Sequence, residues 1–269
     1  MTSCAQKQEI KFDSKIKPNL VYDMTFVTES KTVVDFEGPQ EKLEKIKANG
    51  IVLPIVSESK SEFITKTTTG SLDKNNAFKA KMEYGEIEST EISNGEEKKS
   101  KSPVSGLIIK GQYNENNSFQ IDTMISQTLD ENLKNTIKTS LEGVQSQIKF
   151  PKNPMKVGDD FEQKIPMTIP IAGLPPVEVI ITTNYKLIEI KENLANFELK
   201  QTVSLAMESE QFDIEASGGG EGEAEFDIKR MYLTKNETNL DLKLVVNVND
   251  LVVKAMIKTK SKQDVMIEE

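Results

Sequence analysis

The feature of this chain that most limits its fold is an alternation of apolar and polar residues along most of its length. Successive side chains of a strand point to opposite faces, so a period of two is typical of strands with one buried face. Antiparallel sheets commonly have one face against the core and one in water. The alternation therefore predicts a mostly β protein (α+β) of antiparallel meanders. It is clearest in residues 20–26, 32–36, 78–84, 107–113, 119–125, 165–171, 177–181 and 240–246.

Two segments depart from this period. In residues 129–148 the apolar positions, which include Leu133 and Ile137, are spaced by three or four. This spacing predicts one amphipathic helix packed on the sheet. A shorter helix is expected at residues 40–48, ended by Asn49-Gly50. Residues 98–103 and 217–222 are expected to form mobile loops.

A weak internal similarity indicates how the strands are grouped. The segments GLIIKGQYNENNSFQIDTMI and EFDIKRMYLTKNETNLDLKLVV both resemble hairpins, and each closes one half of the chain. We expect a tether at residues 1–17, a first β half at 18–127, a connecting helix at 128–150 and a second β half at 151–269. The halves form either two similar curved sheets or one continuous half-barrel, with the helix covering its open side.

The composition excludes several classes of function. The net charge is −9, whereas affinity for nucleic acid comes from clustered Lys and Arg, so we expect no nucleic-acid partner. No stretch approaches the roughly 20 consecutive apolar residues of a transmembrane helix. The chain has no histidine and one cysteine, which excludes Ser-His, Cys-His and multi-cysteine metal sites. We expect no metal, no cofactor and no enzymatic activity.

The single cysteine, Cys4, lies in the sequence Met-Thr-Ser-Cys. These four residues resemble the end of a bacterial lipobox, in which an aliphatic residue and two small residues precede the cysteine. The resemblance implies that a signal peptide is cleaved before Cys4 and that lipid is attached to its sulfur and to the new N-terminus. Two or three acyl chains hold a protein durably at a membrane. The alternative is an incidental cysteine at a frayed terminus.

The start Thr-Ser-Cys-Ala-Gln-Lys, in a Lys-rich chain without histidine, is similar to outer-membrane lipoproteins of Bacteroidetes. Surface-exported members carry an acidic cluster directly after the cysteine, whereas Ala5, Gln6, Lys7 and Gln8 follow here. The resemblance therefore implies the periplasmic side of the outer membrane. Residues 122–124, Asp-Thr-Met, match the short pattern that these bacteria use for O-glycosylation, which makes Thr123 a candidate glycosylation site.

Four carboxylates alternate with other residues in SGGGEGEAEFD, residues 217–227: Glu221, Glu223, Glu225 and Asp227. Their negative charge would repel phosphate, and no helix follows the glycines, so a phosphate-binding loop is excluded. Neighbours on one strand face lie about 6.6–7 Å apart, too far for four of them to surround one calcium ion. The pattern predicts a solvated acidic face.

The opposite face of this segment is predicted to hold Phe226, Arg230 and Tyr232, and Arg230 is the only arginine of the chain. An arginine among apolar neighbours must be paired or reach water. One alternative is a structural ion pair, or a side chain that extends past the sheet edge. The other is a cationic anchor in a cavity that binds an anionic lipid head or a carboxylate. In that case Arg230, Tyr232 and Phe226 are the candidate ligand-binding residues.

The anchor, the curved-sheet pattern and the covering helix together are similar to the half-barrels of lipoprotein carriers. This resemblance implies a lipid-anchored periplasmic protein that binds or carries an apolar, lipid-like ligand. Two other functions stay open. One is an envelope scaffold that contacts another protein, and the other is a carboxylate-based hydrolase, which needs two acids converging in a cleft.

Overall fold

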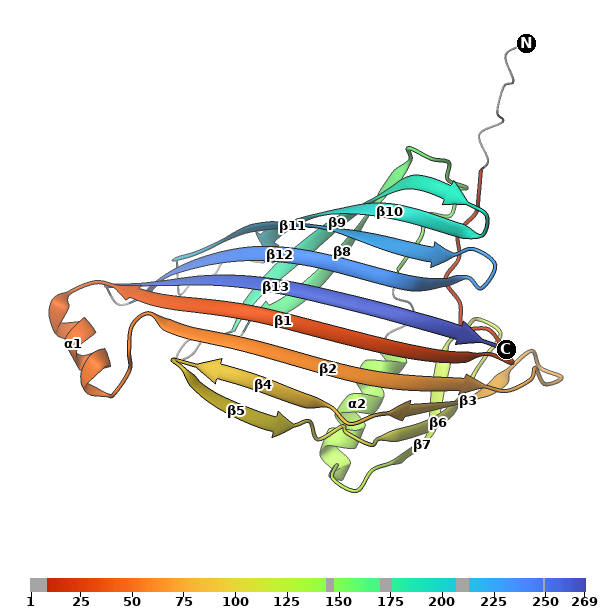
Figure 1. The fold of residues 1–269 in the computed structure, drawn as a ribbon, viewed down its shortest axis with the longest axis horizontal. Coiled ribbons are helices and arrows are strands. Elements are labelled where there is room, and N and C mark those ends of the chain that lie inside the picture. The colour runs from red at the N-terminus through yellow and green to blue at the C-terminus, as the bar shows by residue number, and fades with distance from the viewer. Residues whose placement is uncertain (1–8, 144–147, 170–175, 207–212, 249) are drawn as a thin grey trace, which may run out of the picture.

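The computed structural model describes residues 9–143, 148–169, 176–206, 213–248 and 250–269. It shows one antiparallel sheet of 13 strands, in the order β7-β6-β3-β2-β1-β13-β12-β11-β10-β9-β8, with β4 paired to β2 and β5 to β4 (Figure 1). The elements are β1 (Val21–Glu37), α1 (Gln40–Ala48), β2 (Ile55–Thr69), β3 (Phe78–Tyr84), β4 (Glu88–Ser93), β5 (Glu96–Lys101), β6 (Ile108–Tyr113), β7 (Phe119–Ile125), α2 (Glu131–Gly143), β8 (Asp160–Ile169), β9 (Val177–Lys191), β10 (Leu194–Leu205), β11 (Asp213–Asp227), β12 (Tyr232–Val248) and β13 (Leu251–Glu268).

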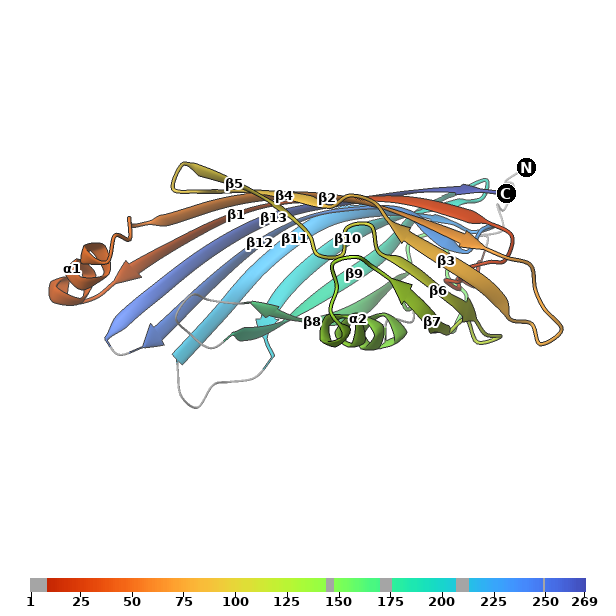
Figure 2. The same cartoon turned by 90° about the horizontal axis from the view of Figure 1, so that it is seen from below.

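The sheet is strongly curved, and both ends of its strand order, β7 and β8, bend toward the same side (Figure 2). Helix α2 follows β7 and precedes β8 in the chain, and it lies between these two strands on the concave side. Within the described ranges β7 does not pair with β8, so the sheet does not close. We define the face toward α2 as the inner face and the opposite face as the outer face.

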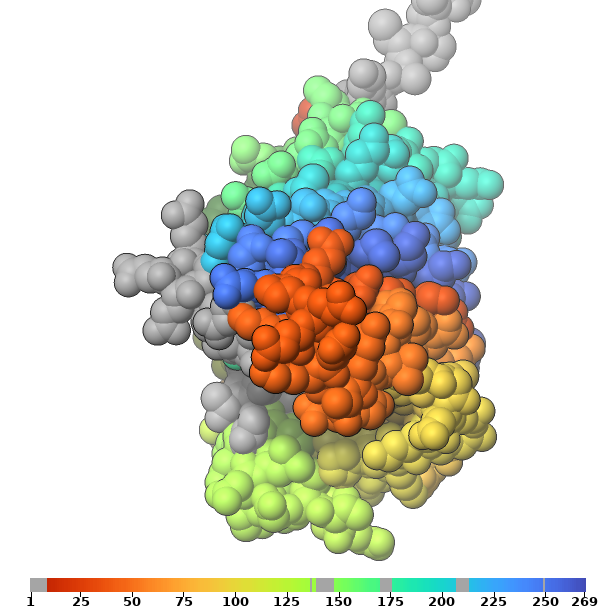
Figure 3. Space-filling model, turned by 90° about the vertical axis from the view of Figure 1, so that its left-hand side faces the viewer, coloured from red at the N-terminus to blue at the C-terminus, as the bar shows by residue number. Residues whose placement is uncertain are grey.

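The mostly β, antiparallel fold expected from the alternation is confirmed, and a single sheet is found rather than two. Strand β1 pairs with β13 along its whole length, from Val21 opposite Glu268 to Glu37 opposite Val252. The first and the last strand of the chain therefore form the middle of the sheet and join the two β halves. The short helix at residues 40–48 is also confirmed, and it projects from one end of the molecule (Figure 3).

Charge is separated between the two faces of the sheet. In the eleven strands of the main order, the described side chains on the inner face include no Asp, Glu, Lys or Arg. The residues at alternate positions, such as Glu29 and Lys31 on β1, point to the outer face and are exposed. This arrangement follows from the cost of burying a charge without a partner.

The buried inner residues form three apolar clusters. The first is rich in aromatic rings and surrounds Phe197. The second surrounds Ile109 on β6 and includes Leu129, with Ile137 of α2 packed against it. The third surrounds Val179 on β9 and Leu244 on β12.

Residues 217–222 lie within β11 rather than in a mobile loop, and the glycines explain why. Glycine occupies every inner position from Gly218 to Gly222. A Cβ at Gly220 would meet the backbone carbonyl of Asn239 on β12, and one at Gly222 would meet that of Glu237. The glycines therefore permit close approach of the β11 and β12 backbones where the sheet bends.

Two other expectations need correction. Residues 98–103 are not a loop as a whole, because β5 extends to Lys101 and pairs with β4. Helix α2 ends at Gly143, and residues 144–147 lie outside the described ranges. Ile148 packs in the aromatic cluster, whereas Ile137 packs against the cluster of β6, so these two residues of the apolar stripe contact different clusters.

The tether expected at residues 1–17 packs on the sheet over its described part. Ile10 forms an antiparallel bridge with Met155, in which each backbone N–H donates to the other carbonyl at 2.8 Å. Phe12 is only 4% exposed and belongs to the aromatic cluster. The backbone N–H of Lys15 donates to the carbonyl of Met231 at 2.9 Å. Residues 9–17 are therefore part of the folded body.

The close approach at β11 leads to a stability prediction. Gly222→Ala places a methyl group against the β12 backbone, so we expect the free energy of unfolding to fall by about 1–3 kcal/mol. Glu223→Ala, on the exposed outer face of the same strand, should change it by no more than about 0.5 kcal/mol. Urea denaturation of the three proteins measures both values. Equal stability of the two variants would contradict the role given to the glycines.

Candidate ligand-binding groove

An open hollow of about 360 Å³ lies on the inner face and is mostly apolar. We define it as the inner groove. It is lined by residues of β8, β9, β10, β12 and β13: Met167, Thr168, Ile169, Ile181, Gln201, Thr238, Leu240, Leu242, Ile257, Thr259 and Ser261. A concave apolar site with a few polar groups is typical of small-molecule binding.

The glycines of β11 explain why this space is not filled. Gly220 pairs with Gln201 on β10 and with Leu240 on β12, so it lies between two groove residues. It has no side chain to occupy the inner face there. The Gln201 side chain extends over it, because a Cβ at Gly220 would lie 2.8 Å from Gln201 Oε1.

Gln201 gives the groove one directional polar group. Its Nε2 donates to Thr183 Oγ1 at 3.2 Å. Its Oε1 is buried and has no hydrogen-bond partner in the described part of the chain. A buried acceptor without a partner costs roughly 1–3 kcal/mol. A shift of the half-buried Gln201 side chain would bring this oxygen to the groove surface, where it could accept a hydrogen bond from a hydroxyl or N–H group of a bound molecule.

Beside the groove, the inner face of three neighbouring strands carries short hydroxyl side chains in place of apolar ones. Ser59 is exposed and the others are half-buried, so a molecule on the inner face can reach them. Ser30 Oγ lies 3.5 Å from Thr259 Oγ1. We define this set as the hydroxyl patch: Thr28, Ser30, Thr32, Ser57, Ser59, Ser61, Thr259 and Ser261. Thr259 and Ser261 also line the groove, so patch and groove are continuous.

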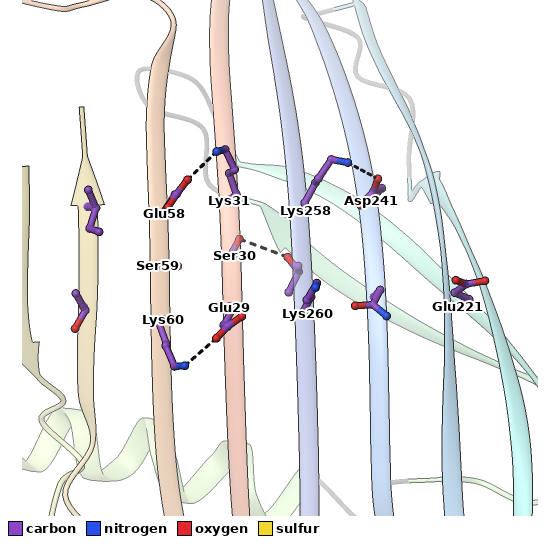
Figure 4. A pocket seen from close by; sticks show the side chains of 14 residues that line it. Glu29, Ser30, Lys31, Glu58, Ser59, Lys60, Glu221, Asp241, Lys258 and Lys260 are labelled. Atoms are coloured by element: carbon purple, nitrogen blue, oxygen red, sulfur yellow. Dashed lines mark hydrogen bonds and ion pairs between the residues drawn. The ribbon is translucent and has the colours of Figure 1, made fainter. Parts of the chain in front are cut away.

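A larger hollow, of about 700 Å³, lies on the outer face over the middle of the sheet (Figure 4). Its acidic and basic residues are equal in number, and six of them form ion pairs between neighbouring strands: Lys31–Glu58 at 2.7 Å, Lys60–Glu29 at 2.8 Å and Lys258–Asp241 at 3.1 Å. A hydrogen bond from the Lys60 ammonium lowers the pKa of Glu29. Such exposed pairs contribute little to stability, because water screens them. Most residues that line this hollow are charged, and their charges balance, whereas the inner groove is lined by uncharged residues. We therefore take the inner groove as the candidate site for an apolar ligand.

Arg230 lies in the turn at residues 228–231, because β11 ends at Asp227 and β12 begins at Tyr232. The prediction from the sequence that a strand runs through Arg230 is therefore wrong. Arg230 Nη1 donates to Asp227 Oδ2 at 3.1 Å, and the Arg230 backbone N–H donates to Asp227 Oδ1 at 2.7 Å. This is the structural ion pair, one of the two alternatives, and Arg230 lines neither hollow described above.

Phe226 and Tyr232 both pack inside the protein, but each contacts a different aromatic residue. Phe226 is 1% exposed, and its ring centroid lies 4.9 Å from that of Phe150 in the aromatic cluster. The Tyr232 ring lies 5.0 Å from the Tyr22 ring. Burial, with a smaller contribution from the Tyr22 phenol, raises the pKa of Tyr232 to about 12. Neither residue lines the inner groove.

The acidic face expected on β11 is found in part. Glu221 and Glu223 are exposed, and Glu225 is half-buried and accepts a hydrogen bond from Thr234 at 2.8 Å. Asp227 is buried, because the turn and Arg230 cover it.

The two candidate modification sites lie apart from the groove or outside the described part of the chain. Thr123 is exposed on β7, and Cys4 lies outside the described residues.

Sequence reasoning missed Gln201 and the hydroxyl patch. A signal is present in TESKT, residues 28–32, and in SESKSE, residues 57–62, where hydroxyl residues alternate with charged ones. The charged residues mark the outer face, so the Ser and Thr residues must share the inner face with the apolar residues of the same strands. The partnerless oxygen of Gln201 depends on tertiary contacts and has no such signal.

No protein-family model matches the chain, and no curated protein matches it. Among solved structures it is similar to the translocator domain of the autotransporter NalP from Neisseria meningitidis, at 8% identity over 91% of this chain and 88% of that chain, with a TM-score of 0.24. The enduracididine biosynthesis enzyme MppR matches at 7% identity over 92% and 88%, with a TM-score of 0.12. An acetoacetate decarboxylase-like enzyme from Sphingomonas wittichii RW1 matches at 8% identity over 93% and 92%, with a TM-score of 0.11. Likenesses at these TM-scores support no conclusion about fold or function.

Proposed function

We propose that this protein binds an apolar, lipid-like ligand in the inner groove, as a lipid-anchored protein on the periplasmic side of the outer membrane. The observation that carries the binding role is the groove itself. It is an apolar hollow on a face whose described strand positions carry no charge, and its acceptor Gln201 Oε1 has no partner among the described residues. Ligand sites are typically about 300–1,000 Å³ in volume, and the 360 Å³ of the groove falls in this range.

The hydrophobic effect supplies the affinity in this proposal. Each Å² of apolar surface removed from water contributes roughly 25 cal/mol. Leu240, Leu242 and Ile257 present such surface on neighbouring strands. The glycines of β11 have no side chains to cover these apolar residues, and a bound ligand would cover them instead.

The anchoring role rests on Cys4. The residues before it resemble a lipobox, which supports covalent lipid attachment at its sulfur. No helix in the described ranges is long and apolar enough to cross a membrane. Ile10 already belongs to the folded body. Six residue steps separate it from Cys4 and span at most about 20 Å. A lipid on Cys4 would therefore hold the body close to the membrane surface.

Filling the groove tests the binding role. Ile257→Trp places an indole in the groove, so we expect the affinity for the apolar dye N-phenyl-1-naphthylamine to fall at least about tenfold. Met256→Trp is the matched control, because Met256 is 49% exposed on the outer face of the same strand, and it should leave dye binding unchanged. Fluorescence titration measures the affinity, and circular dichroism checks that both variants fold. Folded variants with equal dye affinity would contradict binding in the groove.

The anchor is tested in the full-length protein in its native host. We expect wild type in the membrane fraction, with an intact mass raised by the attached lipid, and Cys4→Ser in the periplasmic fraction. Ser3→Ala keeps a small residue before the cysteine and should stay in the membrane fraction. A wild-type protein whose intact mass shows Cys4 without attached lipid would refute the lipid anchor.

A further inference from the structure

We infer, resting on the proposed function, that the ligand is an uncharged amphiphile. Its apolar part lies in the inner groove, and its hydrogen-bonding head lies on the hydroxyl patch. The inference concerns the chemical class of the ligand, and it follows from the distribution of charged and hydroxyl side chains on the inner face.

The inner face offers no partner for a charged head group. The described inner positions of the eleven strands carry no Asp, Glu, Lys or Arg. The Lys and Glu side chains of β1 and β2 lie on the outer face, where Lys31 pairs with Glu58 and Lys60 with Glu29. A charge moved from water onto these strand positions would lose hydration and find no countercharge among their described side chains. Phosphate, carboxylate and ammonium heads are therefore disfavoured.

The hydroxyl patch suits an uncharged polar head. Each Ser or Thr hydroxyl can donate one hydrogen bond and accept others, so the patch can bind hydroxyl, ester or amide groups. Gln201 Oε1 adds a buried acceptor without a partner. This atom favours a ligand that carries a donor near its apolar part.

One molecule of ordinary size can reach both regions. Leu240 pairs with Thr259, Thr259 with Ser30, and Ser30 with Ser59, so these four residues form one row across β12, β13, β1 and β2. Neighbouring strands lie about 4.8 Å apart, so three intervals span about 14 Å. One molecule can therefore place its head group on this row and its acyl chain in the groove.

The test compares two probes with the same acyl chain, monolaurin and laurate, at a pH at which laurate is ionised. Each competes with N-phenyl-1-naphthylamine for the full chain, below the concentration at which either probe forms micelles. We expect monolaurin to displace the dye at a concentration at least about tenfold lower than laurate.

A charge-insertion variant tests the position of the head group. Ser59→Lys places a cation on the inner face at an exposed position, and we expect it to strengthen laurate binding several-fold and to weaken the preference for monolaurin. Thr68→Lys adds the same charge at an exposed outer position of β2 and should keep the wild-type preference. The same response in both variants would overturn the location of the head group.

The outcomes separate this inference from the proposed function. Dye binding with equal displacement by both probes, or with tighter binding of laurate, overturns the uncharged class and leaves groove binding intact. A wild-type protein that binds neither dye nor probe overturns the proposed function and the inference with it.

Discussion

The structure depends on the separation of charge between the two faces of one curved sheet. Hydration keeps the Lys, Glu and Asp side chains of the main strands on the outer face. The described inner positions are left with apolar, glycine, hydroxyl and amide residues. Because the sheet bends toward that face, its apolar residues pack into three clusters instead of requiring a second sheet. Helix α2 then covers part of the concave side between the two ends of the sheet.

The glycines of β11 explain the groove. They let the β11 backbone lie where a Cβ would meet the β12 backbone, and they leave out side-chain volume on the inner face. The space they leave is bordered by leucine and isoleucine on one side and by Gln201 on the other. The residues that let the two backbones approach each other thus also leave room for a ligand.

Sequence patterns predicted the strands well because the period of two reports directly which face each side chain occupies. They failed where glycine replaced the apolar member of the pattern, as at Gly218 to Gly222, since a Gly-rich run is equally typical of a loop. They also placed Arg230 on a strand, because the turn at residues 228–231 continues the apolar alternation with Ile228 and Tyr232. The groove could not be predicted, because it forms between strands that are distant in sequence, such as β8 and β13.

If the inner face holds an apolar molecule, that molecule should be visible in a crystal structure of the protein purified from its own membranes. We expect continuous electron density along Leu240 and Ile257, extending over Gly220 toward the hydroxyl patch. An inner face closed by its own side chains, with no space at Gly220, would contradict this expectation.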